Sequence, residues 1–433
     1  MTVKTSQPEL SHLTLNNGTR CVIATMPDAP LTCLDIWFQA GSFSERPGEE
    51  GLAHFLEHMV FKGSERLQAG EFDRCIEALG GSSNAATGFD DVHFHVLVPP
   101  LAATKALELL LDLVLRPALR PETFAMEREV VLEEIAQYRD QPDEQVIQTL
   151  LKSCCADHPY GRPILGFEDS LNASNPESMR GFHQRRYQGQ NCCLAIAGSI
   201  PEDLAETLRG NCFELIDTAF AMAVPQAKQA WKDNQSEPAQ AKLGFNAGRE
   251  EIQVERLESG RLLMAWQIPP ASNQAMIMGA DLATTLFAEG RRSRLVQHLR
   301  EELQIVESID MDVTALEQGS LVMLEACCPE DQLQHVEQEI TTMLRAGLDS
   351  PPLPQEMDRA RQLVRNGLCF NLEAAGQVAG LAGTQALWDR PQPLLKPLDY
   401  LNTWSADRLQ QEILPLLQPD KCFTLVASSL EAS

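Results

Sequence analysis

The sequence has no long apolar run among its 433 residues. No uninterrupted apolar stretch approaches the roughly 20 residues that a membrane-spanning helix needs. Residues 1–13, MTVKTSQPELSHL, also lack the apolar core of a secretory signal peptide. We therefore expect a cytoplasmic protein without a membrane span.

A Cys-x-x-Cys pair is missing as well, although the chain has 12 cysteines. They are scattered along the sequence, with vicinal pairs at 154–155, 192–193 and 327–328. Such a distribution in a long chain favours reduced thiols at apolar positions over a zinc ribbon or a disulfide framework.

Basic side chains are few beside acidic ones. The 35 Lys and Arg stand against 61 Asp and Glu, which gives a formal net charge of -26 at pH 7. A field of this sign repels nucleic acid and anionic membranes and favours cationic ligands. We expect no nucleic-acid or membrane partner; attraction of basic peptides and simple solubility both stay open as reasons for the charge.

Apolar patterns in the first half predict strands mixed with helices. Residues 19–41 hold two apolar, β-branched runs around a Pro-Asp-Ala-Pro turn, which predicts a hairpin. Residues 91–100 alternate and end in two prolines, and residues 192–200 are apolar, so both predict strands. The apolar spacing within 101–115 and 121–141 is typical of amphipathic helices.

The same order of elements recurs in the second half. Residues 226–248 are polar and have no clear period, which is typical of a linker. Residues 250–269 predict another pair of strands, and helices and a strand at 320–330 follow. We therefore predict an α+β fold with two similar domains, 1–225 and 249–433, each a mainly antiparallel sheet faced by helices.

The segment GLAHFLEHMVFKG (51–63) carries the clearest chemical signal. Its apolar residues form a helical stripe, and residues four apart share a helix face, so His54 and His58 can offer two imidazoles to one ion. Glu57 borders that face. The order H-x-x-E-H reverses the H-E-x-x-H of common zinc peptidases and keeps the same side chains on one turn. The alternative is a half-buried helix whose polar side carries these residues by chance.

A catalytic zinc site has three protein ligands, so a third must come from elsewhere. The segment EREVVLEEI (127–135) is the best source, because Glu127 and Glu134 are seven residues apart and share a helix face. Spacing alone does not choose between Glu133 and Glu134. A solvated acidic helix face is the alternative interpretation of this segment.

Four blocks together carry a family resemblance. They are GLAHFLEHMVFKGSE, GGSSNAATGFDDVHFHVLV, EREVVLEEI and HPYGRPILG. In order and spacing they resemble the inverzincin peptidases of the pitrilysin family, and most closely its processing-peptidase branch. The resemblance is strong over most of the first half and weak over the second.

The resemblance implies a role for each residue of the proposed site. It makes His54, His58 and Glu134 the zinc ligands and Glu57 the general base, while Glu127 steadies the site from behind the ligands. The resemblance places the third ligand at Glu134 because the family's ligand glutamate stands seven residues after another acidic residue, here Glu127. The first domain would then be catalytic, and the second would enclose the substrate.

The second block implies where a peptide substrate binds. On its own it predicts a glycine turn that leads into an edge strand. In the family the matching strand pairs with extended substrate, so Asn84 and Ala85 are expected beside the scissile bond. Asp90 and Asp91 either attract cationic substrate or serve as ordinary turn acids. His158 is expected in a turn and not as a metal ligand.

One departure from the family concerns the second half. Active single-chain relatives carry an arginine and, seven residues later, a tyrosine that bind the substrate backbone and the developing oxyanion. Here Arg300 matches the arginine, although a surface helix residue is an equal interpretation, and Glu307 stands at the tyrosine position. A carboxylate cannot donate to an oxyanion as a phenol does.

These expectations combine into one functional hypothesis with two rivals. Family members of this length resemble half of a clamshell and work as dimers. We expect a zinc endopeptidase subunit that cleaves unfolded peptides such as leader or targeting segments, as a homodimer or with a related subunit that supplies the Arg/Tyr pair. The rivals are a non-catalytic scaffold subunit and a general peptide scavenger.

Overall fold

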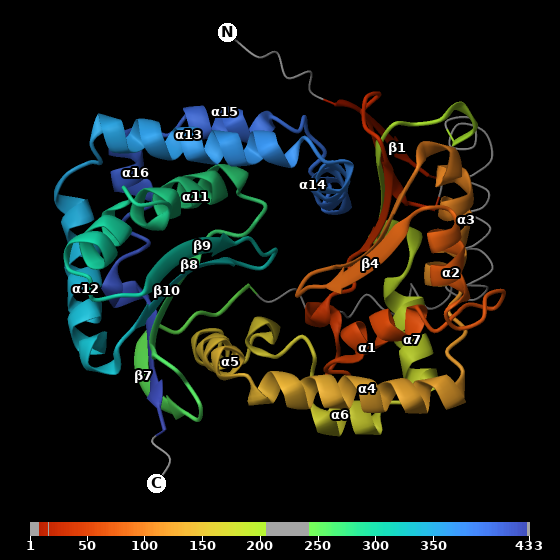
Figure 1. Ribbon diagram of the computed structural model, residues 1–433, viewed down its shortest axis with the longest axis horizontal. Coiled ribbons are helices and arrows are strands. Elements are labelled where there is room, and N and C mark those ends of the chain that lie inside the picture. The colour runs from red at the N-terminus through yellow and green to blue at the C-terminus, as the bar shows by residue number, and fades with distance from the viewer. Residues whose placement is uncertain (1–7, 16, 205–241, 431–433) are drawn as a thin grey trace. The chain divides into compact units, whose positions relative to one another are not determined.

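The computed structural model describes residues 8–15, 17–204 and 242–430, and the chain divides into two compact units (Figure 1). Within the described residues, unit 1 comprises 8–135, 163–204 and 369–394, and unit 2 comprises 136–162, 242–368 and 395–430. Residues 226–241 of the predicted linker lie outside the described residues, so the linker and the domain boundaries stay predictions.

Unit 1 is built on a sheet to which the described part of the chain contributes six strands in the order β1-β2-β6-β3-β5-β4. The strands are β1 (Glu9–Thr14), β2 (Arg20–Thr25), β3 (Thr32–Phe38), β4 (Ser82–Thr87), β5 (Val92–Val98) and β6 (Cys192–Gly198). Neighbours are antiparallel except β2 and β6, which run parallel. All residues of β3 and β6 are buried, which fits their apolar sequences and their central place.

Helices cover both faces of this sheet (Figure 1). On one face they form the main core of unit 1 with Leu34, Ile36 and Phe94 from the strands. These helices are α1 (Leu52–Val60), α2 (Glu71–Ala78), α3 (Ala103–Leu115), the first part of α4 (Pro121–Asp140), α6 (Glu168–Ala173) and α7 (Pro176–Arg186). On the other face α14 (Ala375–Leu387) packs on β2, β3 and β6.

Unit 2 repeats the plan with a sheet in which the described residues form the order β7-β11-β8-β10-β9. The strands are β7 (Gly248–Val254), β8 (Gly260–Ile268), β9 (Ser308–Thr314), β10 (Ser320–Cys328) and β11 (Phe423–Ser429). Only one neighbouring pair of these described strands, β7 with β11, is parallel. Each sheet therefore combines mostly antiparallel pairs with one parallel pair.

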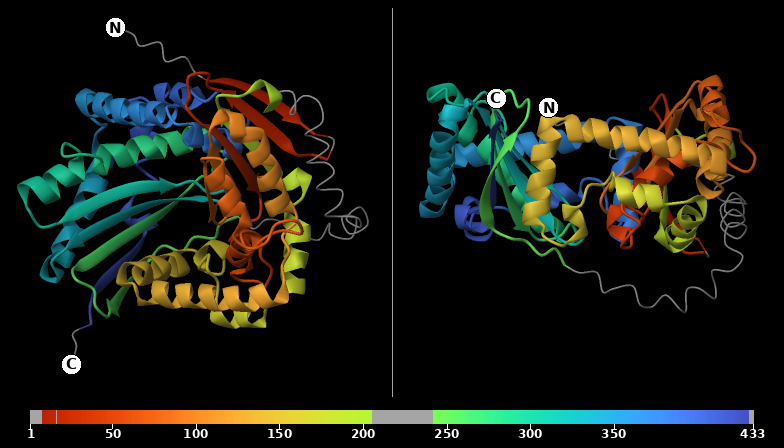
Figure 2. Two further views of the ribbon diagram at one scale, coloured as in Figure 1. Left: turned by 45° about the vertical axis from the view of Figure 1, so that its right-hand side comes forward. Right: turned by 90° about the horizontal axis from the view of Figure 1, so that it is seen from below.

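The helices of unit 2 also lie on both faces of its sheet (Figure 2). Leu262, Met264 and Trp266 of β8 share a core with the helices of one face, and α5 (Pro142–Cys154) covers the other face. The core-forming helices are α11 (Gln274–Ala288), the π-helix η5 (Val296–Glu302), α12 (Leu333–Asp349), α13 (Pro354–Asn371), α15 (Lys396–Asn402) and α16 (Ala406–Glu412). The predicted α+β class with two similar sheet-and-helix units is confirmed.

The two predicted strand pairings are wrong in the same way. β2 and β3 do not form a hairpin, because β6 lies between them and pairs with both. In unit 2, β11 lies between β7 and β8. A turn pattern indicates only that the chain reverses its direction locally. The strand that lies between each predicted pair, β6 or β11, is distant in sequence. The shared insertion supports the predicted similarity of the two halves.

In the part of the chain that the structure describes, no helix combines the length and apolarity that crossing a membrane requires. The cytoplasmic localisation stays a prediction.

Candidate metal centre

The helix α1 carries the H-x-x-E-H segment with its apolar side in the core. Its buried residues are Leu52, Ala53, Phe55, Leu56, Met59 and Val60. His54, Glu57 and His58 occupy the half-buried side. The helix begins after Gly51, whose φ of 93° lies in the left-handed region, and a Cβ there would come within 2.4 Å of the Leu165 carbonyl oxygen. The start of α1 therefore requires glycine.

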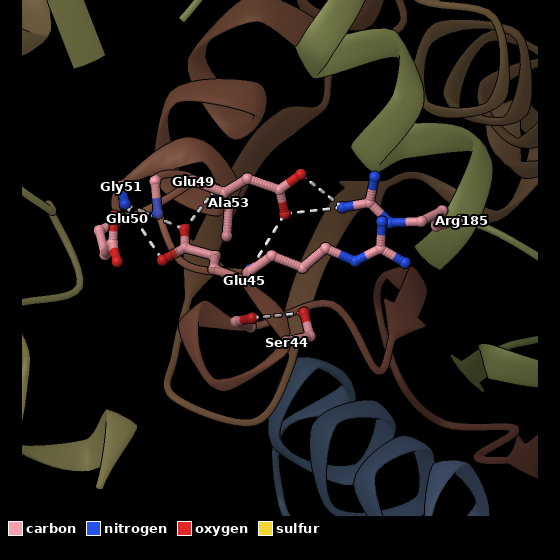
Figure 3. A network of polar contacts seen from close by, with 10 residues as sticks. Ser44, Glu45, Glu49, Glu50, Gly51, Ala53 and Arg185 are labelled. Carbon is pink, nitrogen blue, oxygen red and sulfur yellow. Dashed lines mark hydrogen bonds and ion pairs between the residues drawn. The ribbon is translucent and has the colours of Figure 1, made fainter. Parts of the chain in front are cut away.

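The carboxyl group of Glu45 holds the N-terminus of α1 (Figure 3). The backbone N–H of Ala53 donates to Oε1 of Glu45 at 2.7 Å, and that of Gly51 donates to the same oxygen at 3.1 Å. Nη2 of Arg185 donates to both oxygens of Glu49, each at 2.7 Å, which ties the same loop to α7. Burial raises the pKa of the Glu45 carboxyl to about 8, and the two backbone hydrogen bonds oppose that rise. These contacts hold the first turn of α1 in place.

Glu134 of α4 lies beside both histidines of α1. Its Oε2 is 3.8 Å from Nε2 of His54 and 3.5 Å from Nε2 of His58. One ligand atom from each of the three residues lies within 4.8 Å of the others. The neighbouring Glu133 is exposed. The fold thus places Glu134, and not Glu133, beside the two histidines, a choice that spacing alone leaves open.

The three residues fit a zinc ion chemically and geometrically. Burial, with a smaller contribution from His58, lowers the pKa of His54 to about 4, so this imidazole is neutral at pH 7. Neutral imidazole is the form that binds zinc. Among the described residues, Nδ1 of His54 is buried without a hydrogen-bond partner. Two imidazoles and one carboxylate form a known set of catalytic zinc ligands.

Glu127 orients His58 from the side away from Glu134. Its Oε1 lies 2.9 Å from Nδ1 of His58, and its Oε2 lies 2.8 Å from Nζ of Lys62. Because a carboxylate only accepts, Nδ1 of His58 donates, and the lone pair is left on Nε2, which is the atom beside Glu134. Glu127 is 6% exposed, so the pair is shielded from water.

Glu57 is held at the same site by a residue of β4. The hydroxyl of Thr87 donates to Oε2 of Glu57 at 2.5 Å. Burial raises the pKa of the Glu57 carboxyl, the Thr87 hydrogen bond and the charge of His58 lower it, and Glu134 adds a smaller rise. A raised carboxyl pKa suits a group that takes up and releases a proton near neutral pH.

Asn84 and Ala85 lie on β4, the strand at the end of the sheet of unit 1. Asn84 is exposed, and its Oδ1 accepts from the backbone N–H of Ala85 at 2.9 Å. Ala85 packs against the core. The predicted edge position of this strand is thus observed, while the substrate contact stays a prediction.

The remaining predicted residues have local partners in the structure. Arg300, in the π-helix η5, donates through Nη2 to Glu301 at 2.9 Å, and Glu307 accepts from the hydroxyl of Ser259 at 3.0 Å. His158 accepts from the backbone N–H of Tyr160 at 3.2 Å and caps a short 3-10 helix, in agreement with the predicted turn role. Nε1 of Trp388 donates to Asp91 at 3.3 Å.

Two residues that touch the site escaped the sequence interpretation. Lys62 follows His58 by four residues, a helical spacing, but it lies beyond the end of α1 at Val60. Thr87 is part of the second of the four sequence blocks, yet no local pattern predicts that its hydroxyl points at Glu57. Both depend on packing between elements that are distant in sequence.

Comparison with known proteins assigns the family. The insulinase (peptidase family M16) sequence model matches residues 20–168, and the peptidase M16 inactive domain model matches residues 174–364. An uncharacterised zinc protease of Rickettsia bellii is 28% identical over 82% of this chain and 82% of its own. An uncharacterised zinc protease of Bacillus subtilis is 24% identical over 97% of this chain and 98% of its own.

The fold agrees with this assignment. The crystal structure of a protease from Helicobacter pylori is similar with a TM-score of 0.84 and 21% identity, covering 98% of this chain and 100% of that one. The resemblance inferred from the four sequence blocks is confirmed at the level of the family, and the processing-peptidase branch stays a prediction. The chain belongs to the pitrilysin-type peptidase family M16, whose sequence models cover both of its halves.

Proposed function

We propose that the chain is the catalytic subunit of a zinc-dependent endopeptidase that hydrolyses unfolded peptides. The observation that carries this proposal is the convergence of His54, His58 and Glu134 around one point beside Glu57. The zinc protease names of the relatives from Rickettsia bellii and Bacillus subtilis agree with it.

His54, His58 and Glu134 would hold the metal. Zinc bound there would polarise the peptide carbonyl and lower the pKa of the attacking water to about 7. Glu57 would accept the proton of that water and deliver it to the leaving amine. Its buried carboxyl and its hydrogen bond to Thr87 keep it oriented for both transfers. Glu127 would act as a positioning residue through its bond to His58.

The edge strand β4 would align the substrate. An extended peptide can add to a sheet edge through main-chain hydrogen bonds, and an unfolded segment is the substrate that supplies a free extended backbone. Asn84 and Ala85 would then flank the scissile bond. The formal net charge of -26 favours peptides that carry basic residues.

The chain would work as a dimer. Glu307, at the position of the family's tyrosine, cannot donate a hydrogen bond to an oxyanion as a carboxylate. A related subunit with an Arg/Tyr pair would supply that donor, whereas a homodimer would have to stabilise the oxyanion without it. A π-helical turn often marks a functional site, which supports a substrate contact for Arg300 in η5.

A non-catalytic scaffold subunit is the second candidate, and the match of residues 174–364 to a domain described as inactive favours it. The intact set of two histidines and two glutamates in the first half counts against it. A general peptide scavenger would use the same chemistry as a specific processing enzyme. The two would differ only in how widely their cleavage sites are spread.

The proposal is tested with the purified chain and a quenched, unstructured basic peptide. We expect cleavage that stops on addition of a zinc chelator and returns when zinc is restored. A denatured chain with the same zinc load controls for metal-catalysed hydrolysis. A zinc-loaded chain that cleaves nothing until a related subunit is added would support the heterodimer. Cleavage that survives chelation, or a chain that binds no zinc through His54 and His58, would contradict the proposal.

A further inference from the structure

A second group of metal-binding side chains lies on the sheet of unit 1, on the face opposite to α1. Along β5, Val92, Phe94 and Val96 point into the core that α1 shares, so His93 and His95 point to the other face. Asp35 of β3 lies on that same face, because it alternates with Leu34 and Ile36 of the core. From this arrangement we infer that Asp35, His93 and His95 form a second binding site for a divalent transition metal, with zinc as the expected ion.

The geometry of the three side chains is close to that of a metal site. One ligand atom from each lies within 4.8 Å of the others. Asp35 is directly opposite His95 in the pairing of β3 with β5, and Oδ1 of Asp35 lies 3.0 Å from Nδ1 of His93. Two ligands of a tetrahedral zinc are roughly 3.4 Å apart, given metal–ligand bonds of about 2.0–2.1 Å.

The polar groups of the cluster are only partly satisfied. Asp35 is 2% exposed, and its neighbours along β3 on that face, Cys33 and Trp37, are buried. The bond to His93 satisfies one of its oxygens. Within the described residues, Nδ1 of His95 is buried and has no hydrogen-bond partner. A cation bound to Asp35 and His95 would compensate both groups at once.

Ring stacking holds both histidines in place. The ring of His93 stacks on Trp37 with centroids 4.0 Å apart, and the rings of His93 and His95 are 5.5 Å apart and nearly parallel. On the other side Trp37 contacts Gly383 of α14, where a Cβ would come within 2.8 Å of the indole nitrogen. Burial lowers the pKa of His95, which favours the neutral imidazole.

The site is separate from the one on α1 and needs no catalytic role. Its ligands come from two paired strands, β3 and β5, and sites on strands hold their geometry more precisely than sites on loops. His95 faces Asn84 of β4 across the sheet. A bound ion would therefore stiffen the β4–β5 edge. The competing interpretation is a metal-free hydrogen bond between Asp35 and His93, with His95 as a bystander.

Zinc stoichiometry of the full chain distinguishes these interpretations. The chain is stripped with a chelator and titrated with zinc against a chromophoric competitor. We expect two tight sites in the wild type, one in the double variant His54→Ala/His58→Ala, and none when His95→Ala is added to it. Circular dichroism checks that each variant is folded. His12→Ala, an exposed histidine of β1, is the matched control and should change nothing.

Each outcome decides between the two sites. If the double variant binds no zinc, or if His95→Ala leaves its single site intact, the second site is refuted while the first is untouched. If the double variant keeps both sites, the first assignment fails and the second is judged by His95→Ala alone. Should His95→Ala not fold, His93→Gln replaces it, and a retained equivalent in the folded variant would equally refute the site.

Discussion

Nδ1 of His58 lies 2.9 Å from Oε1 of Glu127, and the same carboxylate reaches Nζ of Lys62 at 2.8 Å. This chain of contacts from Lys62 through Glu127 to His58 sets which ring nitrogen faces Glu134. α4 thus supplies Glu134, a candidate ligand, and also Glu127, which orients the candidate ligand His58. One helix fixes the geometry of the site at two points.

Replacing Glu127 tests this orienting role. In Glu127→Gln the Lys62 ammonium loses its buried counter-charge, and His58 loses a charged acceptor. Removing such an outer partner typically costs roughly 10- to 100-fold in metal affinity. We expect a loss of that size in a zinc competition titration, with the chain still folded. Glu129→Gln, on the same helix with a side chain 71% exposed, should leave zinc affinity unchanged.

A pair of neighbouring glutamates tests the third ligand. Glu134→Gln should weaken zinc binding, because an amide oxygen is a poorer zinc ligand than a carboxylate. Glu133→Gln should bind zinc like the wild type, since Glu133 is exposed. Metal content after dialysis at limiting zinc measures both. The reverse pattern would move the ligand by one residue and contradict the geometry described above.

The hydroxyl of Thr87 is expected to tune the general base. It donates to Glu57 and lowers the pKa of that carboxyl, so Thr87→Val should raise this pKa. A hydrogen bond to a charged group contributes about 1.5–3 kcal/mol, so the acid limb of the kcat/KM profile should move to higher pH by roughly one unit or more. Thr87→Ser keeps the hydroxyl and should restore the wild-type profile. If the acid limb of the kcat/KM profile does not shift in Thr87→Val, the ionisation of Glu57 does not set that limb.

Much of the site can be predicted because its signals are local. The apolar stripe of α1 fixes which face is buried, and the i,i+4 spacing then puts His54 and His58 together on the other face. For α4 the same rule relates Glu127 to Glu134, but only packing against α1 decides that Glu134 and not Glu133 approaches the histidines. The family resemblance implies the same residue, Glu134.

The features that escape prediction are those that depend on distant pairing. β6 enters the sheet between β2 and β3, and no turn signal near residues 19–41 reports it. The helix α14 comes late in the sequence and covers the sheet of unit 1, where it faces Trp37. The cluster of Asp35, His93 and His95 exists only because β3 pairs with β5 in one particular register. The alternation of apolar and polar residues along β5 predicts a strand and does not indicate the cluster.

Stability at low pH should depend on His183. This residue of α7 is buried, and Nε2 lies 3.0 Å from the carbonyl oxygen of Val114. Burial lowers the pKa of His183 from 6.5 to about 4. Between these values the unfolded chain binds a proton that the folded chain does not, so the free energy of unfolding falls as pH falls, by up to about 1.4 kcal/mol per pH unit.

Urea unfolding of the metal-free chain at pH 7 and pH 5 measures this dependence. In His183→Gln the loss of stability between the two pH values should be smaller than in the wild type, because one proton-binding difference is gone. His12→Gln should show the wild-type dependence, since His12 is exposed. Equal losses in all three proteins would show that His183 does not contribute.

The most direct measurement compares the wild type with Glu57→Gln for both bound zinc and cleavage of the quenched peptide. The wild type is measured alone or, if it is inactive alone, with the subunit that activates it. We expect unchanged zinc content in the variant, because His54, His58 and Glu134 remain, and a fall in turnover of at least about 100-fold, because the proton acceptor is lost. Undiminished turnover in Glu57→Gln, or the loss of its zinc, would contradict the assignment of metal ligands and base on which the proposed function depends.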